Sequence, residues 1–520
     1  MKVHLMYRDQ NFVLDKSLPS NYSALEQDLG LGPLFDTMAQ GDKLVYEVVR
    51  KSLLCSLTGV DAVLYRQGVI ADCLDAPDVV RAMYRHVGTT LETRRKNWLG
   101  IFGTHPSGII HSAVTLVHLF TDSLMTLREF ADTEGYRFQS DGFRSFFAML
   151  QRELDDDYIS RVREHLNHLS RPGILVRAQL GRGHRGTNYT LVVDPNGTRG
   201  LIGRLLSQRP TGYTLHVDAR DEAGHRTLEA LEDAGLNLAA NALAQSADHI
   251  KGFFEQLQTE LAFLVGCLNV ADQMIAKGDP LCMPEPWNTD QRVRHFRGLY
   301  DLGLSLRYDG PVVGNDLDAD RTDLIIVTGA NQGGKSTFLR SVGVSQLMMQ
   351  AGMFVPANSF AANVCEGLFT HFRREEDADM NSGKLDEELQ RMSSLADHLA
   401  PNSLILFNES FASTNEREGS EIFQQITDAL LESGIQMVSV SHMYAYAQGY
   451  YARGMPNAVF LRAERDRTFK LKPGRPITTS YGRDLYEQIF NGRSIDSARS
   501  LGSWQQDRAN ATMTETPGRT

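Results

Sequence analysis

Residues 324–349 have the sequence LIIVTGANQGGKSTFLRSVGVSQLMM. The run from Leu324 to Val327 is apolar and rich in β-branched residues, which predicts a buried strand, and the run from Thr337 to Met349 predicts a helix. Between them, Gly329 to Ser336 satisfies the pattern G-x-x-x-x-G-K-[ST]. Glycines in such a loop let backbone N–H groups surround phosphate oxygens, and the start of the following helix adds a positive dipole. We therefore expect a strand–loop–helix unit of an α/β domain that binds nucleotide phosphates.

This glycine-rich loop supplies the predicted ligands of a triphosphate and its metal ion. Lys335 is expected to reach the β- and γ-phosphates, and the Ser336 hydroxyl is expected to ligate Mg²⁺. The predicted nucleotide-binding residues are Gly329, Ala330, Asn331, Gln332, Gly333, Gly334, Lys335, Ser336 and Thr337.

Two further apolar runs predict strands that end in polar residues. The run 404–407 is followed by Asn408 and Glu409, and the run 437–440 leads to His442. Beside a phosphate loop, such strand ends provide the metal-side group and the carboxylate that orients water, so Glu409 is the predicted general base and Asn408 a predicted metal ligand. His442 is expected to contact the γ-phosphate or the attacking water. Asn408 replaces the usual aspartate and adds no negative charge, so weaker Mg²⁺ binding and slower hydrolysis are expected.

Composition limits the class of protein. The 520 residues carry 53 Lys and Arg against 64 Asp and Glu, a net charge of -11, which disfavours a chain that coats nucleic acid along its whole length. The five cysteines are scattered and form no C-x-x-C, so neither a disulfide framework nor a zinc site is expected. The first 20 residues are too polar for a signal peptide, and the longest nearly apolar stretch, 261–271, is too short to cross a bilayer. We expect a cytoplasmic protein that makes no membrane contact.

Helical periodicity dominates the first half of the chain. Apolar residues spaced by three and four between Phe143 and Leu169 predict one helix of about seven turns. A second pattern from Leu236 to about Met274 predicts a rod of roughly 60 Å, either a lever between distant sites or a long core helix. Prolines 280, 284 and 286 are expected to end it.

A basic, β-rich segment interrupts the helices. ILVRAQL, TNYTLVV and YTLHVDA are predicted strands, and residues 171–210 hold seven arginines against one acid, Asp194. One hypothesis is a patch that contacts phosphates of DNA, with Arg177, Arg182 and Arg185 as candidates. The other is an exposed hairpin whose arginines are solvated or paired with acids such as those at 155–157.

Several separated blocks resemble the MutS family of ABC-type ATPases. They are TGANQGGKST (328–337), AGMFVPA (351–357), NSGKLDEELQRM (381–392), LFNESFASTNEREG (406–419), SH (441–442) and the hairpin 460–472 followed by SYG (480–482). Less specific likenesses lie upstream, in VVGNDLD (312–318), LAFLVGCLNVADQM (261–274) and LTGVDAVLYRQGVIADCLDAP (57–77).

The resemblance implies a homodimeric ATPase that uses ATP and Mg²⁺. Two ATPase domains would enclose two nucleotides, and the signature residues Ser382 and Gly383 of one copy would contact the γ-phosphate held by the other. Thr414 and Asn415 would lie in a loop at this interface. The implied domains are a helical core (1–170), a basic β-rich insertion (171–230), a long lever helix with its connector (231–290), an ABC-type P-loop ATPase domain (291–490) and a flexible tail (491–520).

The expected function is ATP-driven opening and closing of helical arms on DNA, in repair or recombination. Family members that read mismatches carry an N-terminal domain with a Phe-x-Glu wedge, and no F-x-E occurs near the start of this chain, so we expect sequence-independent DNA binding without mismatch reading. The alternative is an ATP-switched clamp or scaffold for a protein partner, with little DNA binding or slow turnover.

Overall fold

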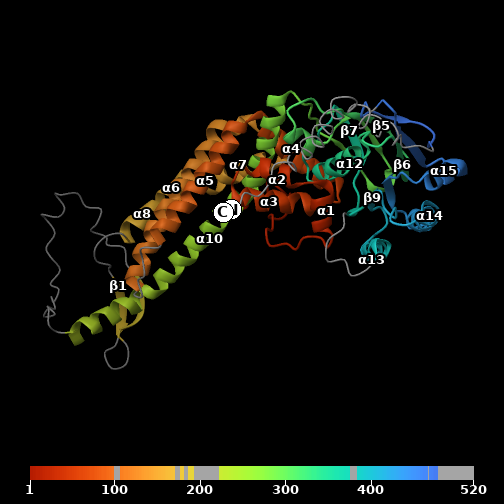
Figure 1. Ribbon diagram of the computed structural model, residues 1–520. Coiled ribbons are helices and arrows are strands. Elements are labelled where there is room, and N and C mark those ends of the chain that lie inside the picture. Colours follow the sequence, from red (N-terminus) through yellow and green to blue (C-terminus); the bar gives the residue numbers. More distant parts are fainter. Residues whose placement is uncertain are drawn as a thin grey trace, which may run out of the picture. The chain divides into compact units, whose positions relative to one another are not determined.

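The computed structural model (Figure 1) describes residues 1–98, 106–169, 176–180, 186–191, 222–374, 383–466 and 468–477. The chain divides into two compact units, each assembled from segments that are distant in sequence. The first comprises Met1–Ser17, Asp36–Ser52 and Leu64–Asp272, and the second comprises Leu18–Phe35, Leu53–Val63 and Gln273–Thr520.

The first unit consists mainly of helices. It contains the end of α2 (Gly32–Ala39), most of α3 (Lys43–Leu54) and α4 (Val60–Asp75), α5 (Pro77–Trp98), α6 (Pro106–Glu134), η1 (Gly135–Arg137), α7 (Asp141–Glu153), α8 (Asp156–Leu169), β1 (Val176–Leu180), β2 (Gly186–Leu191), and α10 (Glu222–Lys277) up to Asp272. Figure 1 shows α5, α6 and α8 running side by side. Val114 and Val117 of α6, Leu166 of α8 and Ala247 of α10 form one buried apolar cluster.

A buried carboxylate ties the N-terminal segment to α10. Glu260 is fully buried, and its oxygens accept hydrogen bonds from the backbone N–H groups of Leu5 (2.6 Å), Met6 (3.0 Å) and Phe12 (3.1 Å). Burying a charge is costly unless hydrogen bonds replace its hydration, and here these three N–H groups and the Gln256 side-chain amide (2.8 Å) do so. Glu260 therefore fixes an otherwise irregular segment.

The single helix expected from Phe143 to Leu169 is wrong, because α7 and α8 are separate helices. The chain leaves helical geometry at Leu154 (φ -112°, ψ 44°), and the Asp155 carboxylate then accepts a hydrogen bond from the Tyr158 N–H at 2.6 Å. An aspartate in this position caps the start of a new helix. The apolar spacing continues across the break because each helix buries apolar residues of its own, Phe143, Phe146 and Phe147 in α7 and Ile159 and Leu166 in α8.

The long helix predicted from residue 236 is longer than expected. α10 contains 56 residues, about 84 Å at 1.5 Å per residue, and Gly278 (φ +74°) follows its end. The part Ala242–Lys277 is long and apolar enough to cross a membrane, but 72% of its apolar window is buried inside the protein, as in the core helix of a soluble protein.

The basic insertion is described only in part. ILVRAQL contains β1 and TNYTLVV overlaps β2, and the two strands pair antiparallel, so both are confirmed. Arg177 lies in β1 opposite Thr190. The third predicted strand, Arg182, Arg185 and the tail after residue 490 lie outside the described residues.

The second unit is a mixed α/β structure. In chain order it contains α1 (Tyr22–Leu29), the start of α2, β3 (Glu285–Trp287), η3 (Thr289–Gln291), β4 (Arg294–Leu299), α11 (Leu302–Arg307), β5 (Asn315–Asp318), β6 (Leu324–Gly329), α12 (Lys335–Gln350), β7 (Ser359–Asn363), β8 (Leu368–Phe372), α13 (Lys384–Ala396), β9 (Leu404–Asn408), α14 (Glu416–Glu432), β10 (Gln436–Val440), α15 (Tyr444–Arg453), β11 (Ala458–Ala463) and β12 (Leu471–Pro473).

Its main sheet has the order β12-β11-β6-β10-β9-β8, with β12 antiparallel and the other neighbours parallel. A second sheet has the order β3-β7-β4-β5. The strands predicted at 324–327, 404–407 and 437–440, the helix after the glycine-rich loop and the C-terminal hairpin are all confirmed.

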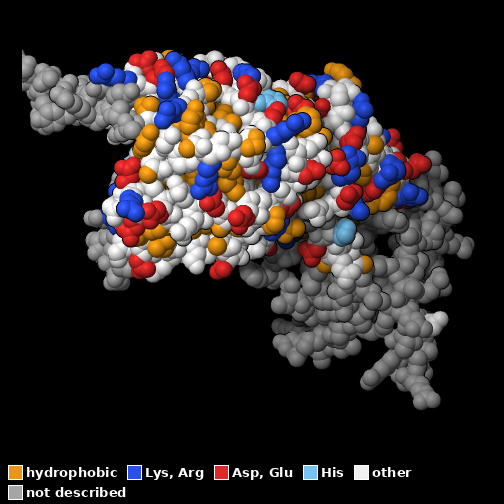
Figure 2. All heavy atoms as spheres, turned by 90° about the vertical axis from the view of Figure 1, so that its right-hand side faces the viewer, with side chains coloured by type: hydrophobic (Ala, Val, Ile, Leu, Met, Phe, Trp, Pro, Cys, Tyr) orange, Lys and Arg blue, Asp and Glu red, His pale blue; other side chains and the backbone are white. Residues whose placement is uncertain are grey.

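Helices cover both faces of the main sheet. Phe407 of β9 packs edge-on against Phe423 of α14 (ring centroids 5.0 Å apart), which stacks on Tyr446 of α15. The preceding residue, Leu406, points to the opposite face, where it lies against Gly343 of α12. Figure 2 shows the outer surface around α14 and α15, where basic and acidic side chains are interspersed.

Candidate functional site

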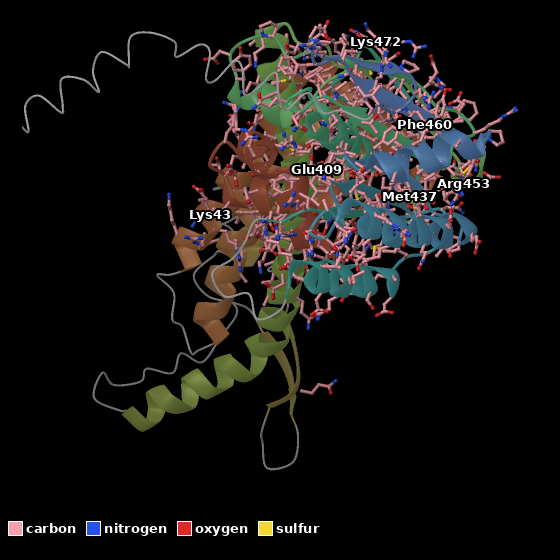
Figure 3. The ribbon with its side chains drawn as sticks, turned by 45° about the vertical axis from the view of Figure 1, so that its right-hand side comes forward. Lys43, Glu409, Met437, Arg453, Phe460 and Lys472 are labelled. Atoms are coloured by element: carbon pink, nitrogen blue, oxygen red, sulfur yellow. The ribbon has the colours of Figure 1, made fainter. Side chains whose placement is uncertain are left out.

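Three neighbouring strands end at one edge of the main sheet. Because β6, β10 and β9 are parallel and Val440 lies between Val327 and Asn408 in register, their carboxyl ends are adjacent. Figure 3 shows Glu409 at this edge and Met437, near the start of β10, toward the opposite one. The glycine-rich loop, Asn408, Glu409 and His442 therefore converge, as the sequence predicts.

The backbone of the loop requires glycine at two positions. Gly329 has φ +105°, and a Cβ there would lie 2.1 Å from the carbonyl oxygen of Ala463. Gly334 is the N-cap of α12 and has φ +85°. Side chains other than hydrogen are strained in this region of φ, so the two glycines let the chain pass directly from β6 into α12.

Lys335 is the first residue of α12 and is almost fully buried. Its ammonium donates to the carbonyl oxygens of Gly329 (3.1 Å) and Ala330 (2.9 Å). Burial lowers the pKa of Lys335, and the negative charge of Glu409 partly opposes this shift. The cation is thus held against the loop, within the electrostatic range of Glu409.

Ser336 and Asn408 form a pair of oxygen donors. The Ser336 hydroxyl donates to the Asn408 side-chain oxygen at 2.9 Å, which joins the start of α12 to the end of β9. Hard oxygen atoms are the ligands that Mg²⁺ prefers, so the two side chains fit this ion, although neither is charged. The next residue along the chain, Glu409, carries a carboxylate at the same sheet edge.

Glu409 lies in a polar hollow of about 420 Å³, whose lining includes Asn331, His442 and Glu416. Its backbone N–H donates to the carbonyl oxygen of Val440 at 2.9 Å, and its φ of +54° is in the left-handed region. The two predicted polar residues, Glu409 and His442, thus share one hollow with the glycine-rich loop.

Sequence analysis missed Arg373 at this hollow. Arg373 directly follows β8, its exposed side chain lines the hollow, and its N–H donates to the carbonyl oxygen of Asn408 at 2.9 Å. The sequence did contain a signal for it, because Arg373 is a cation directly after a fully buried strand. A residue in that position is expected at the same edge of the sheet as Glu409.

A second hollow, of about 450 Å³, lies on the other side of the loop and is mainly apolar. Its lining includes Tyr308, Val312 and Phe469 together with Gln332 and Gly334 of the loop. Both aromatic rings are about half exposed, so their faces are accessible to a flat ligand.

Asn315 fixes the position of Phe469. Its side-chain amide donates to the Phe469 carbonyl oxygen (3.2 Å), and its oxygen accepts from the N–H of Leu471 (2.7 Å). The ring consequently sits beside Gly334, where an added Cβ would lie 3.4 Å from the Cβ of Phe469. No short motif marks this hollow, because its walls come from segments about 160 residues apart in the chain.

The residues expected at a dimer interface lie at two helix starts. Gly383 is the exposed N-cap of α13, while Ser382 lies outside the described residues. Asn415 caps α14, since its side-chain oxygen accepts from the Glu418 N–H at 3.0 Å, and the Thr414 hydroxyl donates to the Glu418 carboxylate.

The second unit is thus a mixed α/β structure, with polar residues gathered at the carboxyl ends of the parallel strands of its main sheet. Comparison with known families gives two matches. The model of the MutS2 N-terminal domain matches residues 58–277, and that of MutS domain V matches residues 325–449. The chain belongs to the MutS family. The first match extends the likeness well beyond the region around 310–490 where the motifs are dense.

Individual relatives have modest identity. The chain is similar to the DNA mismatch repair protein MutS of Porphyromonas gingivalis (37% identical over 23% of this chain and 14% of the relative). It is also similar to Endonuclease MutS2 of Lacticaseibacillus paracasei (32% over 50% and 33%) and of Lactiplantibacillus plantarum (28% over 69% and 47%). The matches thus span less than half the length of each of these relatives.

Proposed function

We propose that the second unit binds and hydrolyses ATP at the glycine-rich loop, as an ABC-type P-loop ATPase domain. The observation that carries this proposal is the position of the loop between two hollows of different character. The apolar hollow beside Tyr308 and Phe469 suits a stacked base, and the polar hollow beside Glu409 and His442 suits the terminal phosphate. A nucleoside triphosphate lying along the loop would fill both.

Each side chain has a role in the proposed reaction. Lys335 offsets the charge of the β- and γ-phosphates, and Ser336 and Asn408 would hold Mg²⁺, which withdraws charge from the phosphate oxygens when bound. Glu409 orients the attacking water and accepts its proton. His442 and Arg373 stabilise the charge that develops on the γ-phosphate.

The test separates binding from hydrolysis. Lys335→Ala should weaken binding of a fluorescent ATP analogue, because a buried cation facing the phosphates is removed. Glu409→Gln should retain binding but lower single-turnover hydrolysis by about a hundredfold or more. Equal hydrolysis rates for Glu409→Gln and the wild type would overturn the role of this carboxylate.

The same proposal includes a homodimer with shared sites. The start of α13 supports it, because Gly383 is exposed and supplies no side-chain cap for the first N–H groups of the helix. Ser382 and Gly383 of one copy would donate to the γ-phosphate in the other, with Thr414 and Asn415 nearby. ATP would then draw the two domains together, and hydrolysis would release them.

Mixed dimers provide a direct test of site sharing. A Lys335→Ala chain and a Ser382→Ala chain should each be inactive alone. In a random mixture, half of the dimers contain one intact composite site, so about a quarter of the wild-type rate should return. If each site were complete within one chain, mixing would restore nothing.

We further propose that nucleotide state opens and closes the helical unit on DNA, in repair or recombination. Support comes from relatives whose names refer to DNA mismatch repair and endonuclease activity, and from the arginines around β1 and β2. Binding should be sequence-independent and weaken steeply with salt. Unchanged DNA affinity after replacing Arg177, Arg182 and Arg185 with Ala would remove these residues from the interface.

The second candidate function is an ATP-switched clamp for a protein partner, with slow turnover and little DNA binding. The neutral Asn408 beside Ser336 favours this candidate, because it predicts weak metal binding. Salt-insensitive association with a protein, without measurable DNA binding, would decide for it.

A further inference from the structure

Helix α13 is attached to the segment that follows Glu409 through one buried carboxylate. Glu388, on the second turn of α13, is 4% exposed. One of its carboxylate oxygens accepts from the Phe411 N–H at 2.6 Å, and the other accepts from the Ser413 hydroxyl at 3.0 Å. A buried charge with two such partners holds them strongly, because losing either leaves one carboxylate oxygen without hydration or a substitute.

The segment that Glu388 holds has an unfavourable backbone. Glu409 has φ +54° and Phe411 has φ +59°, and neither is a glycine. A residue with a Cβ adopts the left-handed region at a cost of about 1 kcal/mol or more, so contacts elsewhere must maintain the geometry. The Phe411 ring is fully buried, and the N–H of the same residue donates to Glu388. These two contacts fix the backbone two residues after Glu409.

His371 of β8 completes the attachment. Its Nε2 lies 3.0 Å from the Glu388 carbonyl oxygen, its Nδ1 lies 2.8 Å from the Ser410 hydroxyl, and its ring stacks on Phe411 at 5.1 Å. The carbonyl can only accept, so Nε2 carries a proton. Strand β8, helix α13 and the segment 409–413 thus form one hydrogen-bonded cluster.

We propose that Glu388 is a positioning residue that sets the direction of the Glu409 carboxylate and makes it depend on the position of α13. This inference rests on the proposed hydrolytic role of Glu409. α13 begins at Lys384, directly after Ser382 and Gly383, the residues proposed to contact the nucleotide of a second copy. Nucleotide bound at one site would therefore change the direction of the Glu409 carboxylate in the other site. A displacement of α13 of the order of a hydrogen-bond length would be sufficient.

The variants separate positioning from simple structural support. Glu388→Ala should lower the single-turnover hydrolysis rate by about tenfold or more, with the dissociation constant for ATP within about twofold of wild type. Glu388→Gln keeps an acceptor for the Phe411 N–H and should retain most of the activity. Glu387→Ala removes a carboxylate from the same helix without touching the segment, so it should behave as the wild type.

A double-mutant cycle tests whether Glu388 acts through Glu409. In a Glu409→Gln background, Glu388→Ala should cause no further loss of hydrolysis. A full additional loss in that background, or a wild-type rate for Glu388→Ala alone, would overturn the positioning role. Wild-type hydrolysis by Glu409→Gln itself would instead overturn the proposed function, so the two failures are distinguishable.

Ser413→Ala provides a second test of the positioning role if Glu388→Ala does not fold. It removes one of the two hydrogen bonds and leaves the buried carboxylate bound to Phe411, so a loss of a few-fold in hydrolysis with unchanged ATP binding is expected. An unchanged hydrolysis rate in Ser413→Ala would overturn it.

Discussion

Replacing His371 should make the second unit less sensitive to acid. Burial, and next the positive charge of Arg391, lower the pKa of His371 from 6.5 to about 4. The unfolded chain takes up a proton at this residue below about pH 6.5, whereas the folded protein resists it until about pH 4. Stability is therefore unaffected by His371 above pH 6.5 and is lost progressively as the pH falls from 6.5 toward 4.

The size of the loss follows from the shift in pKa. Each pH unit in this window changes the free energy of unfolding by about 1.4 kcal/mol, so His371 should account for about 2 kcal/mol between pH 7.5 and 5.0. His371→Asn has no group that titrates there and removes this contribution. The variant is less stable than the wild type at pH 7.5, because it loses the stacking on Phe411, but the difference should shrink at pH 5.0.

Urea unfolding followed by the fluorescence of Trp287, at pH 7.5 and 5.0, measures both values. His398→Asn is the matched control, because His398 is exposed in the same unit and should keep the wild-type dependence on pH. An equal loss of stability in wild type and His371→Asn would refute the reasoning. It would mean that His371 is already protonated in the folded protein, with both ring nitrogens donating.

Three other variants test separate parts of the structure. Asn408→Asp should lower the Mg²⁺ concentration that half-saturates hydrolysis by about tenfold, since a charge is added a few ångströms from the ion; an unchanged metal titration would contradict the metal role of position 408. Phe469→Ala should raise the dissociation constant for ATP by about tenfold through lost stacking, while Lys470→Ala leaves it unchanged; equal effects would exclude a base in the apolar hollow. Glu260→Ala should abolish protection of the Leu5, Met6 and Phe12 amides in hydrogen exchange, and retained protection would show that other contacts hold the N-terminal segment.

The main sheet was predictable because its signals are local. The run before Gly329 is buried on both faces of the sheet, so every residue is apolar, and the loop that follows needs glycine for backbone reasons alone. Asn408, Glu409 and His442 were predictable for the same reason. Parallel strands bring their carboxyl ends together whatever the order of the strands.

Features that depend on side-chain capping or on distant segments were not predictable. At the break between α7 and α8, the Asp155 carboxylate accepts a hydrogen bond from the Tyr158 N–H, and this cap leaves the apolar spacing unchanged. The apolar hollow joins Tyr308 to Phe469, and the attachment of α13 to the segment 409–413 joins Glu388 to Phe411. Nothing in the local sequence of either pair identifies its partner.

The neutral residue at position 408 changes how charge is distributed around the proposed nucleotide. The negative charge of Glu409 partly opposes the lowering of the Lys335 pKa by burial, and Arg373 adds a second cation at the same edge. An aspartate at 408 would place two adjacent carboxylates there, which repel a triphosphate until a metal ion is bound. With asparagine at 408, the cations of the site still attract the phosphates, and one carboxylate fewer repels them. ATP should therefore bind with little dependence on Mg²⁺, while hydrolysis still requires the ion, which separates closing of the site from turnover.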